Sequence, residues 1–165
     1  MENDELWIIG DLSWANAQQT LKLLKQINCK NISLVIGNHD TTIIKDPQIR
    51  SRFKEICEYK ELRLENGYSA ILCHYPIVCF KNHMQGGYHF YAHTHLGFEE
   101  ELTQNSIKDM ICKYGKTERM LNVGVMQPYM NWRPISLEQA VQLIEMREKK
   151  WMQNAEWIDL SKYKP

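Results

Sequence analysis

Short apolar segments alternate with polar, glycine-containing loops in the first forty residues. Residues 5–9 and 31–36 are rich in aromatic and β-branched side chains, and they stop at Gly10-Asp11 and at Gly37-Asn38 respectively. Both segments predict buried strands. Apolar residues recur at helical spacing between them, from Ala15 to Ile27. The unit predicts strand, helix, strand, with the two strands parallel and both following loops at the same edge of a sheet.

The middle of the chain carries further strand patterns. A second amphipathic stretch runs from Pro47 through Phe53, Ile56 and Cys57. Residues 61–64 and 68–73 then flank Asn66-Gly67, a dipeptide that favours a tight hairpin turn. Short apolar runs at 88–92 and 120–125 predict two more strands.

Helical patterns dominate the later part of the chain. Residues 98–118 are rich in Glu and Lys and predict a helical or mobile excursion. Ser136 with Gln139 three residues later is typical of a capping box, and it predicts a helix that continues to about Lys149. We expect residues 151–165 to pack on the same domain. No repeat or flexible linker divides the chain, so residues 1–165 predict one domain.

Composition and charge narrow the class of protein. The chain has 165 residues, of which 44% are hydrophobic and 24% charged, as in ordinary globular domains. Twenty basic residues balance twenty acidic ones, which argues against extended nucleic acid or a membrane surface as a partner. No apolar run approaches the ~20 residues of a membrane helix. The five scattered cysteines suit reduced thiols, and we expect a cytoplasmic protein.

Polar residues with metal-ligating chemistry follow the predicted strands. Each alone has an ordinary explanation as a turn or surface residue, but four of the six histidines belong to this set. A carboxylate can bridge two divalent cations, while an amide oxygen and neutral imidazoles complete them. His83 and His89 lack such partners and are expected to be a loop and a strand residue. The set comprises Asp11, Asn38, His39, His74, His93 and His95.

Several short blocks together resemble the calcineurin-like metallophosphoesterases. The blocks span about residues 4 to 145, and G-N-H-D after a strand is the most specific of them. They are Gly10-Asp11, Gly37-Asn38-His39-Asp40, Cys73-His74-Tyr75-Pro76, Ala92-His93-Thr94-His95, and Asn122-Val123-Gly124-Val125 followed by Arg133-Pro134-Ile135.

The resemblance implies an α/β sandwich of two β-sheets flanked by helices, in four layers, with two metal ions at the strand ends. Carried over by motif, Asp11 would bridge the two ions. One ion would be completed by Asn38, His74 and His93, and the other would take His95.

The implied reaction is hydrolysis of small phosphomonoesters or phosphodiesters. A metal-bound hydroxide would attack phosphorus in line. His39, oriented by Asp40, would stabilise or protonate the leaving oxygen. The ligand set accepts manganese, which we expect first, and also iron, zinc or nickel.

Two departures from the family pattern are visible. Ala92 stands where the family usually has glycine, which we expect to be tolerated unless the backbone needs a positive φ. No D-x-H motif precedes Asp11, so we expect the first strand of the fold and its following helix to be missing. One ion then keeps four candidate ligands, whereas the other keeps only Asp11 and His95. A single-metal site and self-association through an open sheet edge are the corresponding expectations.

Two alternatives stay open at this point. The chain could be a catalytically impaired fragment or remnant that binds one metal or a phosphate ligand. It could also be an unrelated zinc hydrolase built around His93 and His95. That last hypothesis is less favoured, because Leu96-Gly97 follow the pair in place of further ligands and because it leaves G-N-H-D unexplained.

Overall fold

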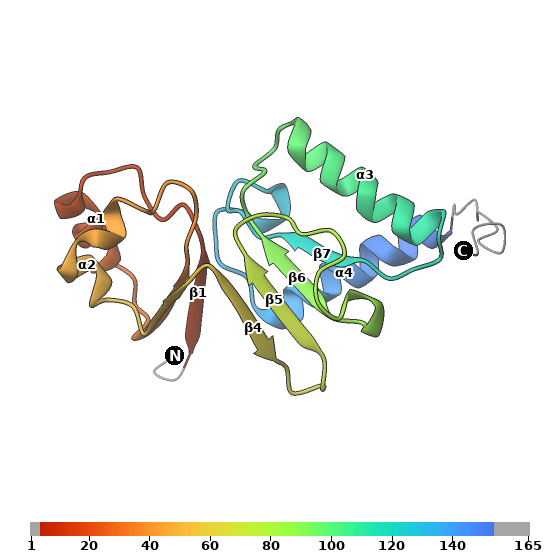
Figure 1. Cartoon of the computed structure of the whole chain (residues 1–165), viewed down its shortest axis with the longest axis horizontal. Helices are drawn as coiled ribbons and strands as arrows, with labels where there is room; N and C mark the ends of the chain where they lie inside the picture. The colour runs from red at the N-terminus through yellow and green to blue at the C-terminus, as the bar shows by residue number, and fades with distance from the viewer. Residues whose placement is uncertain (1–3, 154–165) are drawn as a thin grey trace.

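The computed structural model describes residues 4–153, and these form two β-sheets (Figure 1). The first sheet is parallel, with strand order β1-β2-β3, and the second has strand order β4-β5-β6-β7. In the second sheet β4 is antiparallel to β5, while β5, β6 and β7 are parallel. The strands are β1 (Glu5–Ile9), β2 (Asn31–Val35), β3 (Glu55–Cys57), β4 (Tyr59–Arg63), β5 (Ser69–Cys73), β6 (Tyr88–Tyr91) and β7 (Arg119–Asn122).

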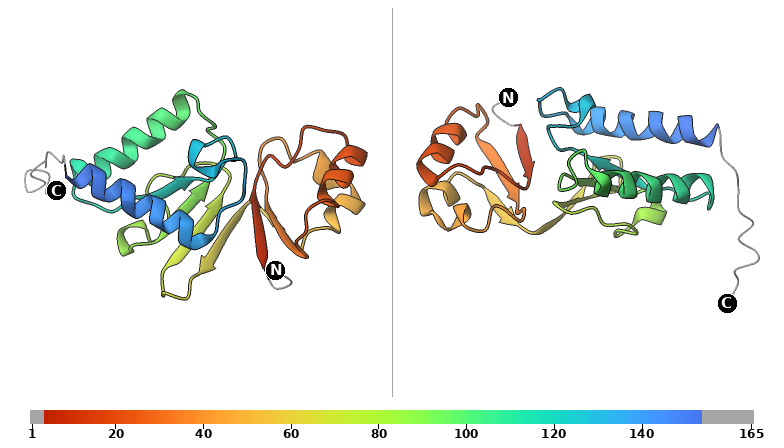
Figure 2. Two further views of the ribbon diagram at one scale, coloured as in Figure 1. Left: turned by 180° about the vertical axis from the view of Figure 1, so that it is seen from behind. Right: turned by 90° about the horizontal axis from the view of Figure 1, so that it is seen from above.

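Four α-helices accompany the sheets in the described part of the chain. Helices α1 and α2 lie together beside the first sheet, and α3 and α4 lie on opposite faces of the second (Figure 2). Three short 3₁₀ helices occur in the connections, at Ile43–Lys45, His83–Gln85 and Pro128–Met130. The α-helices are α1 (Ala17–Leu24), α2 (Pro47–Arg50), α3 (Phe98–Cys112) and α4 (Leu137–Met152).

The alternation of side chains along β5 explains how the second sheet is covered on both faces. Ala70 and Leu72 point to a core that includes Ile9 of β1 and Ile144 of α4. Ile71 points the opposite way, into a cluster with residues of α3. The first sheet has its own cluster on the side of α1 and α2. The inner face of the second sheet is therefore shared by the first sheet and by α4.

A single residue, Glu58, separates β3 from β4 and carries the chain from one sheet to the other. The loops after β1, β2, β5 and β6 meet where the two sheets approach each other. A contact between the first and second sheets shows this directly, because Nδ1 of His74 lies 2.9 Å from the carbonyl oxygen of Ile9. The carboxyl ends of these four strands thus form one locus.

Several sequence predictions are confirmed. Strands β1 and β2 pair in parallel over all five residues of each. Asn66 and Gly67 form the hairpin turn between β4 and β5, with Gly67 at a φ of 84° and the Asn66 side chain accepting the Tyr68 N–H. The capping box at Ser136 and Gln139 is present at the start of α4. The mixed α/β class with two sheets and flanking helices is as expected.

Other predictions need correction. The stretch after Pro47 forms only the four-residue helix α2, because Ile56 lies in β3 and pairs with Leu34 of β2. The strand expected at 120–125 is β7, and it ends at Asn122, whose side chain accepts the Gly124 N–H and turns the chain. Of the tail expected to pack on the domain, Trp151 does so, and residues 154–165 lie outside the described part.

A membrane-spanning helix is not found among the described residues, since none of their helices combines the required length and apolar character.

Candidate metal centre

A buried carboxylate, that of Asp40, ties together the loops that follow β1 and β2. Its Oδ2 accepts the backbone N–H groups of Asp11 and Gly37, both at 2.8 Å. Its Oδ1 accepts the N–H of Leu12 at 2.7 Å. Asp40 is completely inaccessible to solvent, so these charge-assisted hydrogen bonds are made away from water. They fix the backbone position from which the Asp11 side chain projects.

Two glycines allow the loops to approach this closely. A Cβ on Gly37 would lie 2.4 Å from Oδ1 of Asp11, and one on Gly10 would lie 2.2 Å from Nδ1 of His74. Gly10 also has a φ of 78°, and Asp11 follows in the left-handed region at 53°. Aspartate tolerates that region better than most side chains. Glycine at positions 10 and 37 is therefore a packing requirement of the site.

The imidazole of His74 lies at the centre of the converging side chains. His74 follows β5 and is buried. Its Nδ1 faces the carbonyl oxygen of Ile9 at 2.9 Å, so Nδ1 carries the proton and Nε2 presents a lone pair. Around that Nε2 lie Oδ1 of Asn38 at 3.1 Å, Nδ1 of His93 at 3.2 Å and Oδ2 of Asp11 at 3.4 Å. Four potential ligand atoms thus converge on one small volume.

The spacing of these atoms suits a metal ion. One ligand atom each of Asp11, His74 and His93 lies within 4.8 Å of the other two. Burial and the neighbouring His74 lower the pKa of His93, which favours the neutral imidazole that can act as a ligand. The other ring nitrogen of His93 lies 3.9 Å from the Glu99 carboxylate, beyond hydrogen-bond distance.

Two exposed aromatic rings lie next to histidines of the candidate site. The ring of Tyr75 lies 4.7 Å from that of His93 and 5.2 Å from that of His74, measured between centroids. The ring of Trp14 lies 5.0 Å from that of His39. Trp14 and Tyr75 are both exposed to solvent. Tyr75 therefore packs against the His74 and His93 rings, whereas Trp14 contacts His39.

The structure places His39 next to the cluster but not in contact with the carboxylate expected to orient it. His39 is exposed, and its backbone N–H donates to Oδ1 of Asp11 at 3.0 Å. Both oxygens of Asp40 are engaged by backbone N–H groups, and the described hydrogen bonds include none from the His39 ring to Asp40. In this structure Asp40 positions the two loops, and its orientation of the His39 imidazole stays a prediction.

His95, which was predicted for the second ion, is not part of the group formed by the ligands predicted for the first. The residue is exposed and has a φ of 46°. Its backbone carbonyl accepts a hydrogen bond from the Gln127 side chain, and its imidazole is not part of the group formed by Asp11, His74 and His93. The other four predicted ligands, including Asn38, do converge.

The remaining histidines lie outside the cluster, as expected. His83, expected in a loop, begins the short 3₁₀ helix between β5 and β6 and pairs with the buried Glu118 at 2.9 Å. His89 is a buried strand residue whose Nε2 accepts the Ile77 N–H. Ala92 does not have a positive φ, which confirms that alanine is tolerated there.

Two functional candidates in α3 were not predicted from the sequence. Glu99 faces His93, and Glu100 accepts a hydrogen bond from the hydroxyl of Thr94, the residue between His93 and His95. The signal that could have indicated them is the run of three glutamates just after the H-x-H loop, in the first turn of the predicted helix.

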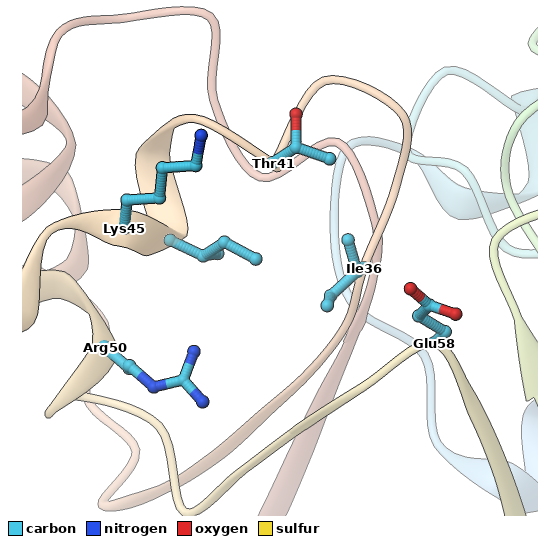
Figure 3. Close-up of a pocket in the computed structure, with 6 residues that line it drawn as sticks. Ile36, Thr41, Lys45, Arg50 and Glu58 are labelled. Carbon is cyan, nitrogen blue, oxygen red and sulfur yellow. The ribbon is translucent and has the colours of Figure 1, made fainter.

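A separate cavity of about 440 Å³ lies beside α2 (Figure 3). Lys45 and Arg50 reach into it from one side, and Glu58 reaches in from the other. Ile36, Thr41 and Ile44 complete its lining. None of the predicted metal ligands lines this cavity, so the cavity is distinct from the cluster of Asp11, Asn38, His74 and His93.

Comparison with known proteins identifies no relative: no family model, no curated protein and no solved structure matches this chain.

Proposed function

We propose that the chain is a metal-dependent phosphoesterase of the calcineurin-like type, acting on small phosphomonoesters or phosphodiesters. The observation that carries the proposal is the convergence of Asp11, Asn38 and His93 on Nε2 of His74, at 3.1 to 3.4 Å. The blocks of sequence that resemble that family supply these same residues. Two sheets with helices on their faces support the sandwich expected for it.

The chemistry of the donor set fits a divalent cation. The Ile9 carbonyl holds the proton of His74 on Nδ1, so Nε2 faces the oxygens of Asp11 and Asn38 with a lone pair. Lone pairs that face one another at these distances repel. A cation placed among them turns this repulsion into coordination, and a mixed nitrogen and oxygen set suits manganese, iron, zinc or nickel.

Each residue then has a distinct task. A bound divalent ion supplies Lewis acidity toward a phosphoryl oxygen and lowers the pKa of water. Asp11, Asn38, His74 and His93 hold the ion, and Asp40 keeps the Asp11 loop in place. The backbone N–H of His39 bonds to Asp11, so the exposed His39 side chain starts next to the ion-binding residues and is the proposed proton donor to the leaving oxygen.

The first test is metal binding and turnover in Asp11→Asn. This change removes the carboxylate charge while keeping the side-chain shape and an oxygen for the His39 N–H. We expect the unaltered protein to bind manganese and to hydrolyse bis-p-nitrophenyl phosphate or p-nitrophenyl phosphate. In Asp11→Asn, metal affinity should fall at least ~10-fold, a loss typical of a disturbed ligand shell. Metal content and absorbance of released nitrophenolate are the measurements.

Asp109→Asn is the matched control, because Asp109 is a partly exposed residue of α3 that pairs with Lys113 at 2.8 Å and belongs to none of the predicted site residues. It should leave binding and turnover unchanged. His39→Ala should retain the metal but lose turnover by ~10²-fold or more if its imidazole is the proton donor. Turnover that survives Asp11→Asn would rule out the proposed site.

A second candidate function is binding of one metal or of a phosphate ligand without catalysis. The observation that favours it is that the described residues form one group of three carboxylate and histidine ligands, Asp11, His74 and His93. A second ion would have only Asp11 and His95 as predicted ligands. About one metal per chain without turnover on either substrate would favour this binding function over the enzyme.

A further inference from the structure

A buried carboxylate in the first turn of α3, that of Glu100, joins four segments of the fold. Its Oε2 accepts hydrogen bonds from the hydroxyl of Thr94 at 2.5 Å and the amide of Asn122 at 2.9 Å. Its Oε1 accepts from the amide of Gln104 at 2.7 Å, and the hydroxyl of Tyr91 lies 3.2 Å from both oxygens. Glu100 is only 9% exposed.

The stability of α3 does not require this burial. Exposed Glu99 and Glu101 already supply negative charge in the first turn, where it is favourable. Burying a carboxylate costs free energy unless it is well hydrogen-bonded. An apolar residue of similar volume would fill the same space without this cost. The buried carboxylate therefore indicates a role in fixing the positions of the groups that donate hydrogen bonds to it.

Thr94 is the hydrogen-bond donor that connects this network to the candidate metal centre. It lies between His93 and His95 in the chain, and its hydroxyl also accepts a hydrogen bond from Asn122 at 3.1 Å. The Gln127 side chain holds the carbonyl of His95 on the same turn. The N–H of His93 is fixed separately, by the carbonyl of His74 at 2.9 Å.

We infer that Glu100 is a positioning residue, which acts through Thr94 to hold the imidazole of His93 at the candidate metal centre. The inference rests on the proposed metal site. The Glu100 carboxylate fixes the Thr94 side chain. Because His93 directly precedes Thr94 in the same turn of the backbone, fixing Thr94 also fixes the position of His93. In this arrangement Glu100 itself contacts neither the metal-ligating atoms nor the substrate.

The test compares Glu100→Gln with Glu101→Gln in the full chain. Both changes remove one negative charge from the same helical turn, but only Glu100 contacts Thr94. Co²⁺ is the probe, because its visible absorption depends on the geometry of the ligands and gives a dissociation constant by titration. We expect Glu100→Gln to weaken Co²⁺ binding ~10–100-fold and to alter the spectrum, as changes to residues that support ligands do. Glu101→Gln should match the unaltered protein.

Two further variants keep the inference falsifiable if Glu100→Gln does not fold. Thr94→Val removes the hydroxyl at nearly constant shape and should reproduce the altered Co²⁺ spectrum. Thr94→Ser keeps the hydroxyl and should show the Co²⁺ spectrum of the unaltered protein. Thermal unfolding of the metal-free variants separates the two roles, because a merely structural role lowers the unfolding temperature without changing the spectrum of the folded complex.

The outcomes distinguish this inference from the proposed function. Co²⁺ binding and spectrum unchanged in Glu100→Gln or, where that variant does not fold, in Thr94→Val would overturn the inference and leave the metal site standing. Failure of the unaltered protein to bind Co²⁺ would overturn both.

Discussion

Single buried side chains determine much of the candidate site. The Asp40 carboxylate has no access to solvent, yet it sets the position of Asp11 through three backbone N–H groups. Charge-assisted hydrogen bonds of this kind are shorter and stronger than neutral ones. A buried partner can thus be as important to a metal centre as the residues that touch the ion.

At the same scale, His89 makes the stability of the fold depend on pH. Burial lowers the pKa of His89 from 6.5 to about 4. Its neutral ring donates from Nδ1 to the Ile71 carbonyl and accepts the Ile77 N–H. In the unfolded chain the ring binds a proton below pH 6.5, whereas in the folded protein it does so only near pH 4. Stability from His89 is therefore complete above pH 6.5 and falls as the pH is lowered toward 4.

The difference between the two pKa values corresponds to about 3 kcal/mol. Urea unfolding of the unaltered protein and of His89→Gln, from pH 7.5 to pH 4, measures this contribution. Over that range the free energy of unfolding should fall by about 3 kcal/mol less in His89→Gln than in the unaltered protein. His95→Gln is the control, because His95 is exposed. Parallel pH profiles for the unaltered protein and His89→Gln would contradict the prediction.

At the scale of elements, the start of α4 depends on its capping box. The Ser136 hydroxyl accepts the Gln139 N–H at 3.3 Å, and the Gln139 side chain accepts the Ser136 N–H at 2.9 Å. We expect Ser136→Ala to destabilise the protein by about 1 kcal/mol, measured by urea unfolding, because the Gln139 N–H at the helix start loses its side-chain acceptor.

Ser106→Ala in the middle of α3 is the matched control for Ser136→Ala. The Ser106 hydroxyl bonds to the Leu102 carbonyl one turn earlier, a contact that adds little to helix stability. Its removal should change the free energy of unfolding by less than about 0.5 kcal/mol. Equal losses in the two variants would show that the cap has no special role.

At the scale of the whole molecule, β1 is the edge strand of the first sheet within the described residues. Its only strand partner there is β2. The strand carries Leu6, Trp7 and Ile8, all partly exposed, and it contains neither proline nor lysine, which commonly protect such edges. We expect a second copy of the chain to pair with this edge at high concentration.

Hydrogen exchange at micromolar and at near-millimolar protein concentration tests this association, together with sedimentation. Amides of residues 5–9 should gain protection as the concentration rises, whereas those of α3 should not. A protein that stays monomeric throughout, with unchanged exchange in β1, would exclude pairing through this edge.

The two sheets show how far the chain could be predicted and where the prediction failed. Residues 5–9 and 31–36 were assigned correctly to within one residue, because short runs rich in β-branched and aromatic side chains that end at glycine are typical of buried strands. Ile56 and Cys57 were placed in an amphipathic stretch and instead lie in β3. A three-residue strand carries too little periodicity to identify, and its formation depends on pairing with β2.

The sequence by itself determined the elements that depend on neighbours along the chain: the strand runs, the Asn66-Gly67 turn, the Ser136 cap and the residue types suited to a metal. Only the tertiary structure decided which of those residues meet. His74 contacts the Ile9 carbonyl across 65 positions of sequence, and Asp40 reaches back across 29 to Asp11. Contacts between the loops of the two sheets bring Asn38 and Asp11 to His74, whereas contacts within the second sheet and α3 bring His93 to His74 and Glu100 to Thr94. Periodicity and turn chemistry do not encode such contacts, because they act over only a few residues.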